Sequence, residues 1–427
     1  LGYYISTQPT TYYGEKTEEQ VKNFQRDFGL PVSGIADEVT LARIKEVLSN
    51  RIITTYSYYD ITLDEALNIQ MTSSPQTDKY RNDPAYISAT YVNIDRVRIT
   101  GSSVNLRRTP DFKHSPVRSV GLGTTLTFLG EVTGANHQGS TKWYEVRYNN
   151  QKLYVHSSLA TLLGTVTGNN VNVRSGQGTS YHIFGKLKKD TTVTIINRGS
   201  KWHRISYSTW RNATRSDVRP YLDPNKNDKY QHLLLSGTAG LEAKDLRSLL
   251  SGKGTLNGTE SIFINASRKY NVNEAYLVAH ALLESGNGTS TLAKGVEVGK
   301  DRNGNIVLVT NSNRKNLTDI KEVYNMFGIA AVDSNPVRGG ARKAYEEGWT
   351  SVKKAIEGGA KWISENYVNH PSYQQNTLYK MRWNPNSPGT HQYATDIGWA
   401  VKQTSRIKTV YDKLPNAILH FDIPVYK

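Results

Sequence analysis

The sequence predicts a multidomain protein in which a mostly α C-terminal domain with one β-hairpin follows two small β-barrels and a small N-terminal α-helical module. Three observations carry this prediction. The 427 residues are enough for two to four domains. Residues 92–207 contain a repeated pattern of short alternating strands. Apart from His280, residues 275–283 are apolar on every face of a helix, which is typical of a helix inside a domain core.

The net charge of +16 is unevenly spread along the chain. Residues 92–207 hold 16 Lys and Arg against 5 Asp and Glu, whereas residues 1–91 hold 8 against 12. A basic middle and end predict a polyanionic partner, either nucleic acid or an anionic surface such as a cell wall. The chain contains no Cys, which excludes disulfides and thiolate metal sites.

Residues 1–50 are expected to form a partial helical module. Thr17 can cap a first helix and Gly29 ends it, and Pro31 shapes the turn before a second helix. The segment VKNFQRDFGLPVSGIADEVT is similar to the small helical peptidoglycan-binding domain. This resemblance covers only the later part of that domain, because residues 1–16 make a poor first helix.

Residues 51–91 are expected to be a connector with one short helix at 61–71. Thr62 can cap that helix, with Glu65 in the capping-box position. The segment that follows is polar and rich in turn residues, and we assign no chemistry to it.

An internal repeat organises the basic middle of the chain. SSVNLRRTP at 102–110 recurs as NNVNVRSGQG at 169–178, and an alternating strand follows each copy. Two small β-barrels in tandem, at 92–163 and 164–207, are therefore expected.

A Trp-containing strand, at Trp143 or Trp202, completes each copy. The order of VNxR, strand and W-x-x-V/I resembles bacterial SH3-like domains. This resemblance implies that the modules as wholes bind cell-wall peptides or glycans, and we interpret both Trp side chains as barrel core. The second copy departs from the pattern after Tyr207, so its last strand has to be supplied differently.

The stretch NEAYLVAHALLESGNG ends the core-type helix on a carboxylate, Glu284, with Gly286 and Gly288 as terminators. The negative end of the helix dipole and apolar neighbours both raise the pKa of a carboxyl group placed there. A helix-terminal Glu turned out to solvent is the ordinary alternative. A carboxylate at the C-terminal end of a buried helix faces the negative end of the helix dipole and does not stabilise the helix. This placement favours a role for Glu284 as a general acid.

A hairpin is expected next, at 295–311, with Asn303-Gly304 as its turn. The spacing of Asp301, Asn303 and Asn305 weakly resembles that of a calcium-binding loop. The glycine and the distal Glu that such a loop requires are not at the matching positions. Further helices are expected at 337–347, 350–367 and 397–414. A mostly α domain with one hairpin directly after a catalytic Glu is the ground plan of lysozyme-like folds.

Four segments of residues 208–427 occur in a recognisable order: YNVNEAYLVAHALLESGNGTSTLAKG, YNMFGIAA, GGAKWISENYV and NTLYKMRWNP…GTHQYATDIGWA. They resemble endo-β-N-acetylglucosaminidases of the autolysin type, glycoside hydrolase family 73. This resemblance implies a catalytic domain with a lysozyme-like fold, without cofactor or metal. It also implies cleavage of the bond after N-acetylglucosamine in bacterial peptidoglycan.

The same resemblance implies roles for individual residues. Glu284 matches the family's general acid, and Tyr393 and Tyr367 match tyrosines that the family needs for activity. The candidate substrate-binding residues, from the motif that lines the family's groove, are Asn325, Phe327 and Gly328. Any of these aromatic side chains could instead be a packing residue.

A second catalytic carboxylate is harder to assign. Most glycosidases pair the acid with another carboxylate. Glu297 and Asp301 are the candidates, because they lie on the hairpin that would form the opposite wall. We prefer attack by the substrate's own 2-acetamido group, an exception that such enzymes use. Tyr393 would then orient that group or stabilise the developing positive charge.

Other functions are weighed against this one. A muramidase or lytic transglycosylase of the same fold would leave different product ends. A nucleic-acid-binding protein would suit the charge, but its usual motifs are absent. The presence of Glu284 and Tyr393 argues against a non-catalytic cell-wall-binding protein. His280 and Glu284 form HxxxE rather than HExxH, which argues against a metal hydrolase.

The expected partners are peptidoglycan glycan strands and stem peptides, with anionic wall polymers attracted by the basic charge. We expect no nucleic-acid partner, no membrane span and a monomeric chain. The N-terminal segment LGYYISTQPT carries no signal-peptide pattern. Because the substrate lies outside the cell, we expect a secreted, cell-wall-associated chain from which a signal peptide has been removed.

Overall fold

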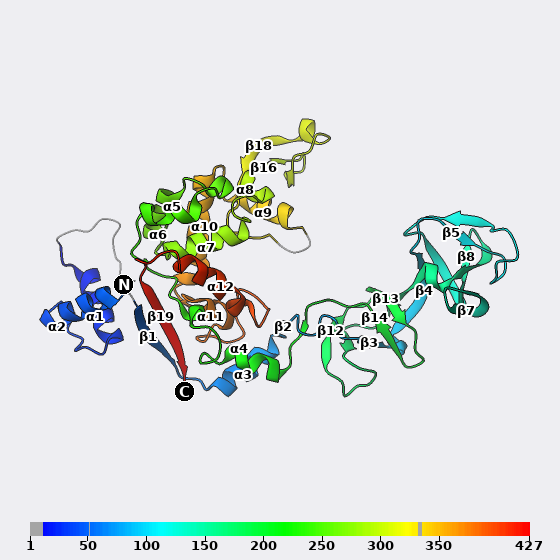
Figure 1. Ribbon diagram of the computed structural model, residues 1–427, viewed down its shortest axis with the longest axis horizontal. Helices are drawn as coiled ribbons and strands as arrows, with labels where there is room; N and C mark the ends of the chain where they lie inside the picture. The colour runs from blue at the N-terminus through cyan, green and yellow to red at the C-terminus, as the bar shows by residue number, and fades with distance from the viewer. Residues whose placement is uncertain (1–11, 51, 332–334) are drawn as a thin grey trace. The chain divides into compact units, whose positions relative to one another are not determined.

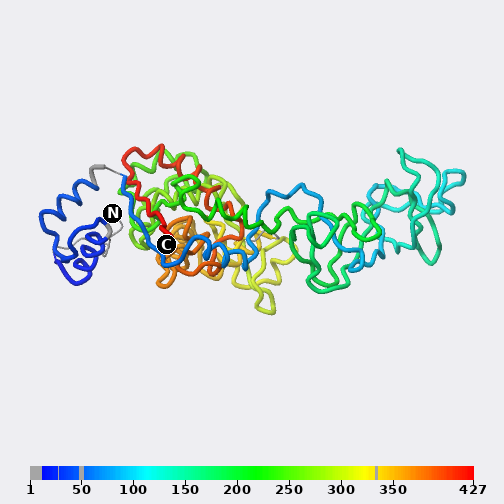
Figure 2. The backbone as a smooth tube through the Cα atoms, turned by 90° about the horizontal axis from the view of Figure 1, so that it is seen from below, coloured from blue at the N-terminus to red at the C-terminus, as the bar shows by residue number. Residues whose placement is uncertain are grey.

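The computed structural model describes residues 12–50, 52–331 and 335–427. The chain divides into two compact units (Figures 1 and 2). Leu1–Ser73 and Arg215–Lys427 form the first unit, and Ser74–Thr214 form the second. Within the described ranges, no helix combines the length and apolar character needed to cross a membrane.

The N-terminal part of the first unit contains two helices, α1 (Glu15–Asp27) and α2 (Glu38–Asn50). The predicted cap at Thr17 is wrong, because α1 begins at Glu15 and its N-cap is Gly14, three residues before Thr17. The buried side chain of Gln25 fixes the turn between the helices. Its Oε1 accepts from Gly34 N at 2.8 Å, and its Nε2 donates to Thr40 Oγ1 at 3.0 Å.

A parallel strand pair joins the predicted connector to the C-terminus of the chain. β1 (Ile52–Tyr59) pairs with β19 (Leu419–Tyr426) over eight residues, and the two strands run side by side in Figures 1 and 2. Helix α3 (Leu63–Thr72) follows and begins with the predicted Thr62–Glu65 capping box. The buried amide of Gln70 in α3 donates to Trp383 O at 2.7 Å. Residues 52–72 therefore pack as part of the C-terminal domain.

A buried ion pair lies against this strand pair. It joins Lys380 of α11 (Leu378–Trp383) to Asp422 of β19, and the two side chains are 7% and 9% exposed. Ser57 Oγ donates to Asp422 Oδ2 at 2.7 Å. Burial alone would raise the pKa of Asp422, but the Lys380 ammonium and these hydrogen bonds bring it below its ordinary value.

Replacing Lys380 by Met is expected to lower the free energy of unfolding of the first unit by about 3–5 kcal/mol, because Asp422 is then buried without its cation. Urea denaturation followed by tryptophan fluorescence measures this change. The control is Lys408→Met, which breaks the exposed pair Lys408–Asp412 and should leave the midpoint nearly unchanged. Equal effects of the two substitutions would contradict the prediction.

The second unit contains one ten-stranded sheet, to which both sequence repeats contribute, and separate two-stranded pairs; the strands of the two repeats are called the first and second barrel. Their strands are β4 (Val92–Ile99), β5 (Val104–Leu106), β6 (Arg118–Val120), β7 (Thr125–His137), β8 (Ser140–Tyr148) and β9 (Gln151–His156) in the first barrel, and β10 (Ala160–Val166), β11 (Val171–Arg174), β12 (Ile183–Leu187), β13 (Thr192–Asn197) and β14 (Trp202–Ile205) in the second. A short pair, β2 (Gln76–Thr77) with β15 (Arg211–Asn212), closes the unit.

The last strand of the second barrel comes from upstream. β3 (Ala85–Ser88) pairs with both β14 and β11, and so takes the place that β9 occupies beside β8 in the first barrel. These residues were expected to be connector. Trp143 is buried as predicted, whereas Trp202 is only half-buried.

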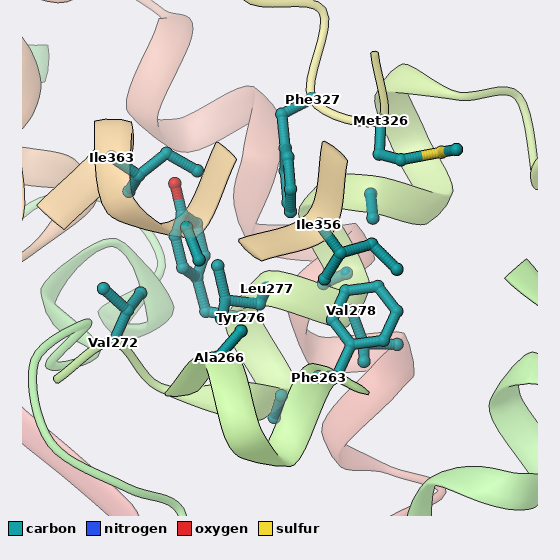
Figure 3. Close-up of a cluster of buried hydrophobic side chains, with 14 of the residues drawn as sticks. Phe263, Ala266, Val272, Tyr276, Leu277, Val278, Met326, Phe327, Ile356 and Ile363 are labelled. Atoms are coloured by element: carbon teal, nitrogen blue, oxygen red, sulfur yellow. The ribbon is translucent and has the colours of Figure 1, made fainter. Parts of the chain in front are cut away.

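The C-terminal domain is mostly helical. Its remaining helices are α4 (Arg215–Leu222), α5 (Ala243–Leu250), α6 (Glu260–Tyr270), α7 (Glu274–Glu284), α8 (Thr291–Lys294), α9 (Pro336–Glu346), α10 (Val352–Ile363) and α12 (Trp399–Tyr411). The last three agree closely with the predicted ranges, and a π-helical turn at Ser364–Val368 extends α10. Side chains of α6, α7 and α10 pack into one core (Figure 3).

The predicted hairpin is present as β16 (Val296–Lys300) and β17 (Ile306–Leu308). A third strand, β18 (Thr318–Val323), pairs with the other edge of β16 and was not predicted. In Figure 1 this small sheet lies beside α9 and extends beyond the other helices.

Candidate active site

Helix α7 delivers Glu284 from the interior of the domain. Asn273 caps its start by accepting from Tyr276 N at 3.0 Å. In Figure 3 the α7 side chains Tyr276, Leu277 and Val278 lie among core residues of neighbouring elements. The helix ends at Glu284, as the glycine pattern predicted. The carboxylate therefore stands on a rigid, buried support.

The Glu284 carboxyl group is partly shielded from water, with 39% of its side chain exposed. Burial raises its pKa above the ordinary value, and the nearby positive charge of Arg406 opposes that rise. His280 Nε2 lies 4.0 Å from Glu284 Oε1. Burial lowers the pKa of His280 to about 4, so this imidazole is neutral at pH 7 and forms no ion pair with the acid. The Glu284 carboxyl group therefore keeps its proton to a higher pH than an ordinary carboxyl group does.

A small pocket opens beside this acid. It is lined by Tyr276, Ala279, His280, Leu283, Glu284, Leu378, Tyr393, Trp399, Gln403, Arg406 and Ile407. The predicted residues Glu284 and Tyr393 therefore share one cavity. Apolar walls around a few polar groups are typical of small-ligand sites.

Aromatic contacts hold Tyr393 in place. Its ring centroid lies 4.6 Å from that of Trp399 and 5.0 Å from that of Tyr367, which meets it edge-on. Burial and the charge of Glu284 both raise the pKa of Tyr393, so its phenol keeps its proton and remains a hydrogen-bond donor. Tyr367 does not line the pocket and contacts it through Tyr393.

The loop from Asn325 to Ile329 places Gly328 in close contact with the Glu284 carboxylate. Gly328 has φ +63°, and a Cβ atom placed on it would lie 2.6 Å from Glu284 Oε2. Asn325 is 2% exposed and shapes this turn: its Nδ2 donates to Ile329 O at 2.9 Å, and its Oδ1 accepts from Phe327 N at 3.2 Å. Phe327 is buried beside His280. Asn325 and Phe327 therefore build the loop, and Gly328 reaches the carboxylate.

The two hairpin carboxylates are engaged elsewhere. Glu297 is exposed and forms an ion pair with Arg314. Asp301 Oδ2 accepts from Asn305 Nδ2 at 2.9 Å, and Asp301 Oδ1 accepts from Asn305 N at 2.9 Å and from Asn303 N at 2.8 Å. These hydrogen bonds, above all the one from the Asn305 side chain, lower the pKa of Asp301. Neither residue lines the pocket. The structure therefore does not bring the expected second carboxylate to Glu284.

One wall of the pocket consists of residues that were not among the predicted site residues. Trp399, Gln403 and Arg406 all come from α12 and all line the cavity. Their spacing of four and three residues places them on one helix face, which is a signal that the sequence contains. No cluster of three metal-ligating side chains occurs in the described part of the chain.

Three parts of the chain match known protein families. Residues 260–412 match the family described as mannosyl-glycoprotein endo-beta-N-acetylglucosaminidase, and residues 102–161 match the bacterial SH3 domain. Residues 1–44 match the putative peptidoglycan binding domain. That match begins at residue 1, so it covers more of the module than the sequence motif indicated; residues 1–11 lie outside the described structure.

Two relatives show the extent of the similarity. The β-N-acetylglucosaminidase of Bacillus subtilis (strain 168) is 36% identical over 375 residues, which are 86% of this chain and 32% of that protein. A bifunctional autolysin of Staphylococcus epidermidis is 46% identical over 250 residues, 56% of this chain and 18% of that protein. The chain thus spans about a third or less of the length of these relatives.

Solved structures are similar over half of the chain. The structure of a major bifunctional autolysin is 41% identical, covers 51% of this chain and 84% of its own, and has a TM-score of 0.37. A catalytic mutant of Staphylococcus aureus autolysin E, in complex with the disaccharide NAG-NAM, is 33% identical, with coverages of 52% and 88% and a TM-score of 0.40.

These matches define a modular protein that joins a glucosaminidase domain to bacterial SH3 and peptidoglycan-binding modules. The acid at the end of a buried helix and the aromatic pocket beside it lie inside the matched glucosaminidase region. The chain belongs to the autolysin-type glucosaminidases.

Proposed function

We propose that this chain hydrolyses the β-1,4 bond after N-acetylglucosamine in bacterial peptidoglycan, with Glu284 as the general acid. The observation that carries the proposal is the half-buried Glu284, with its raised pKa, in one pocket with Tyr393. The family match supports a glycosidase, and the muropeptide and NAG-NAM complexes of related autolysins support a peptidoglycan glycan as substrate.

The chemistry follows from the protonation state of this acid. Glu284 gives its proton to the glycosidic oxygen, and the bond from that oxygen to the sugar C1 breaks. The carbonyl oxygen of the substrate's 2-acetamido group bonds to C1 and forms an oxazolinium ring. The Glu284 carboxylate then takes a proton from water as the water oxygen attacks C1 and opens the ring.

We assign to Tyr393 the role of orienting the substrate's 2-acetamido group. Its protonated phenol can donate a hydrogen bond, and its ring is fixed by Trp399 and Tyr367. Substrate assistance is favoured because Glu297 and Asp301 are held by Arg314 and by the hairpin turn. Tyr367, Asn325 and Phe327 act by positioning Tyr393 and Gly328.

The product ends distinguish this function from its rivals. Purified peptidoglycan is digested, reduced with borohydride and analysed by mass spectrometry. Reduced N-acetylglucosamine ends are expected. Reduced N-acetylmuramic acid ends would identify a muramidase, and anhydro ends a lytic transglycosylase; either result would contradict the proposal. Absence of any new end would indicate a wall-binding protein without activity.

Replacing Arg406 by Gln is expected to move the basic limb of the pH–rate profile to higher pH. The Arg406 charge lowers the pKa of Glu284, so its removal lets that pKa rise and keeps the acid protonated to higher pH. The shift is measured from rates on soluble glycan strands between pH 4 and 9. This interval of about five pH units includes the ordinary pKa values of carboxyl and imidazole groups. Lys408→Gln, on the same helix but outside the pocket, is the control and should leave the limb in place.

The accessory modules fit an insoluble substrate. The peptidoglycan-binding match and the autolysin relatives support a cell-wall-associated protein. Weak wall-binding modules on the same chain raise the effective concentration of the catalytic domain at the wall. Because residues 92–207 are strongly basic, we also propose attraction to anionic wall polymers that weakens with salt.

A further inference from the structure

A second cavity lies in the unit of the two barrels, far along the chain from Glu284. This junction cleft has a cavity volume of about 560 Å³ and is lined by residues of both barrels. The first barrel supplies Asn93 of β4 and Glu131 of β7. The second supplies Arg198, Ser200 and His203 from the β13–β14 turn and from β14. Its size suits a ligand of a few residues. Neither barrel alone would form it.

The turn that presents Arg198 is fixed by its backbone. A Cβ atom on Gly199 would lie 2.3 Å from Trp202 O, so only glycine fits this close approach. The Arg198 guanidinium lies 5.6 Å from the ring centroid of Phe128. A cation–π contact of this kind orients the guanidinium, and its Nη1 lies 3.9 Å from Glu131 Oε1, too far for a hydrogen bond. The cleft therefore holds a pre-positioned donor for a carboxylate.

Two buried polar atoms in the cleft have no hydrogen-bond partner within the described protein. His203 is only 5% exposed, and its Nδ1 is unpartnered. Its other nitrogen bonds to the Gly199 backbone, and burial with the Arg198 charge lowers the pKa of the ring. A neutral imidazole that donates through Nε2 presents Nδ1 as an acceptor. Glu131 Oε1 is likewise buried without a hydrogen bond.

The charges in the cleft have mixed signs. Glu131 lies 3.5 Å from Lys142 Nζ and 3.9 Å from Arg198 Nη1, beyond hydrogen-bond distance from either cation. A polyanion in the cleft would be repelled by the Glu131 carboxylate that lines it. A ligand with both an ammonium and a carboxylate would satisfy Glu131 and Arg198 together, and an amide N–H would satisfy His203.

We propose that the junction cleft binds a short zwitterionic peptide, with its ammonium on Glu131, its carboxylate on Arg198 and an amide N–H on His203. The proposal rests on the proposed function only in taking the peptidoglycan stem peptide as the natural source. The tandem barrels would then recognise the peptide part of the wall while the C-terminal domain acts on the glycan.

The test is calorimetric titration of the full chain carrying Glu284→Gln with the synthetic tripeptide L-Ala-D-isoGlu-L-Lys. Saturable binding is expected, and acetylation of both amines of the tripeptide should weaken it roughly tenfold or more, as loss of a charge-assisted hydrogen bond implies. Adding Glu131→Gln should weaken binding of the free peptide by a similar factor and abolish the effect of acetylation. Arg198→Gln should abolish the effect of amidating the carboxylates.

Glu145→Gln is the matched control. Glu145 is 21% exposed against 23% for Glu131, and it also faces a lysine, Lys152, at 3.5 Å, but it lies outside the cleft. This variant should bind as the parent does. No saturable binding up to about 10 mM, or equal weakening by the two Glu variants, would overturn the proposal. The product-end analysis reports the glycosidase function independently, because it uses the chain with Glu284 intact.

Discussion

Glu284→Gln is expected to reduce turnover of peptidoglycan by about 10²- to 10⁴-fold, the usual contribution of a general acid. The amide has nearly the same shape as the protonated acid but cannot give a proton to the leaving oxygen. The fold should survive, because the side chain is part-exposed at the end of α7. Release of reducing ends measures turnover, and circular dichroism checks the fold.

Glu297→Gln and Asp301→Asn provide the comparison for this substitution. Both carboxylates lie on the hairpin, outside the pocket that contains Glu284. Each variant should keep most of the wild-type turnover. Loss of activity in either one, with the fold intact, would contradict substrate assistance and restore a second protein carboxylate.

Gly328→Ala is expected to reduce turnover roughly 10- to 100-fold, as a catalytic group displaced by about 1 Å can. The new methyl group would lie 2.6 Å from Glu284 Oε2, so the carboxylate has to move. The left-handed backbone of residue 328 adds a destabilisation of about 1–2 kcal/mol. Rates on soluble glycan strands and thermal unfolding measure the two effects.

Gly304→Ala separates these two effects. Gly304 has φ +78°, but a Cβ atom there would meet nothing within 4 Å. This variant should lose a similar amount of stability while keeping its activity. If Gly328→Ala stays as active as Gly304→Ala, the close contact with Glu284 has no catalytic importance.

The position of Glu284 at the end of a buried helix could be predicted from sequence because its signals are local. The apolar residues before Glu284 and the glycines after it specify a buried helix and its end within one short stretch. The role of Asp301 had a local signal as well. An Asp two residues before Asn303-Gly304 is typical of a side chain that caps a turn, and it does so here.

Long-range pairing could not be predicted in the same way. The hydrogen bond between Ser57 and Asp422 joins residues 365 positions apart in the sequence. Nothing in the residue pattern of β1 indicates that β19 is its partner strand. The strand that completes the second barrel also arrives from outside the repeat, as β3. An alternating pattern predicts a strand and the face that it buries, whereas the choice of partner depends on the whole fold.

The pH dependence of the residual turnover by Glu284→Gln, measured beside the wild type on soluble glycan strands, tests the role of Glu284 most directly. The wild-type rate should fall as pH rises through the raised pKa of Glu284, because the acid loses the proton it must donate. The variant has no such group, and its slower rate should stay flat over the same range. A basic limb at the same pH in both proteins would contradict Glu284 as the general acid.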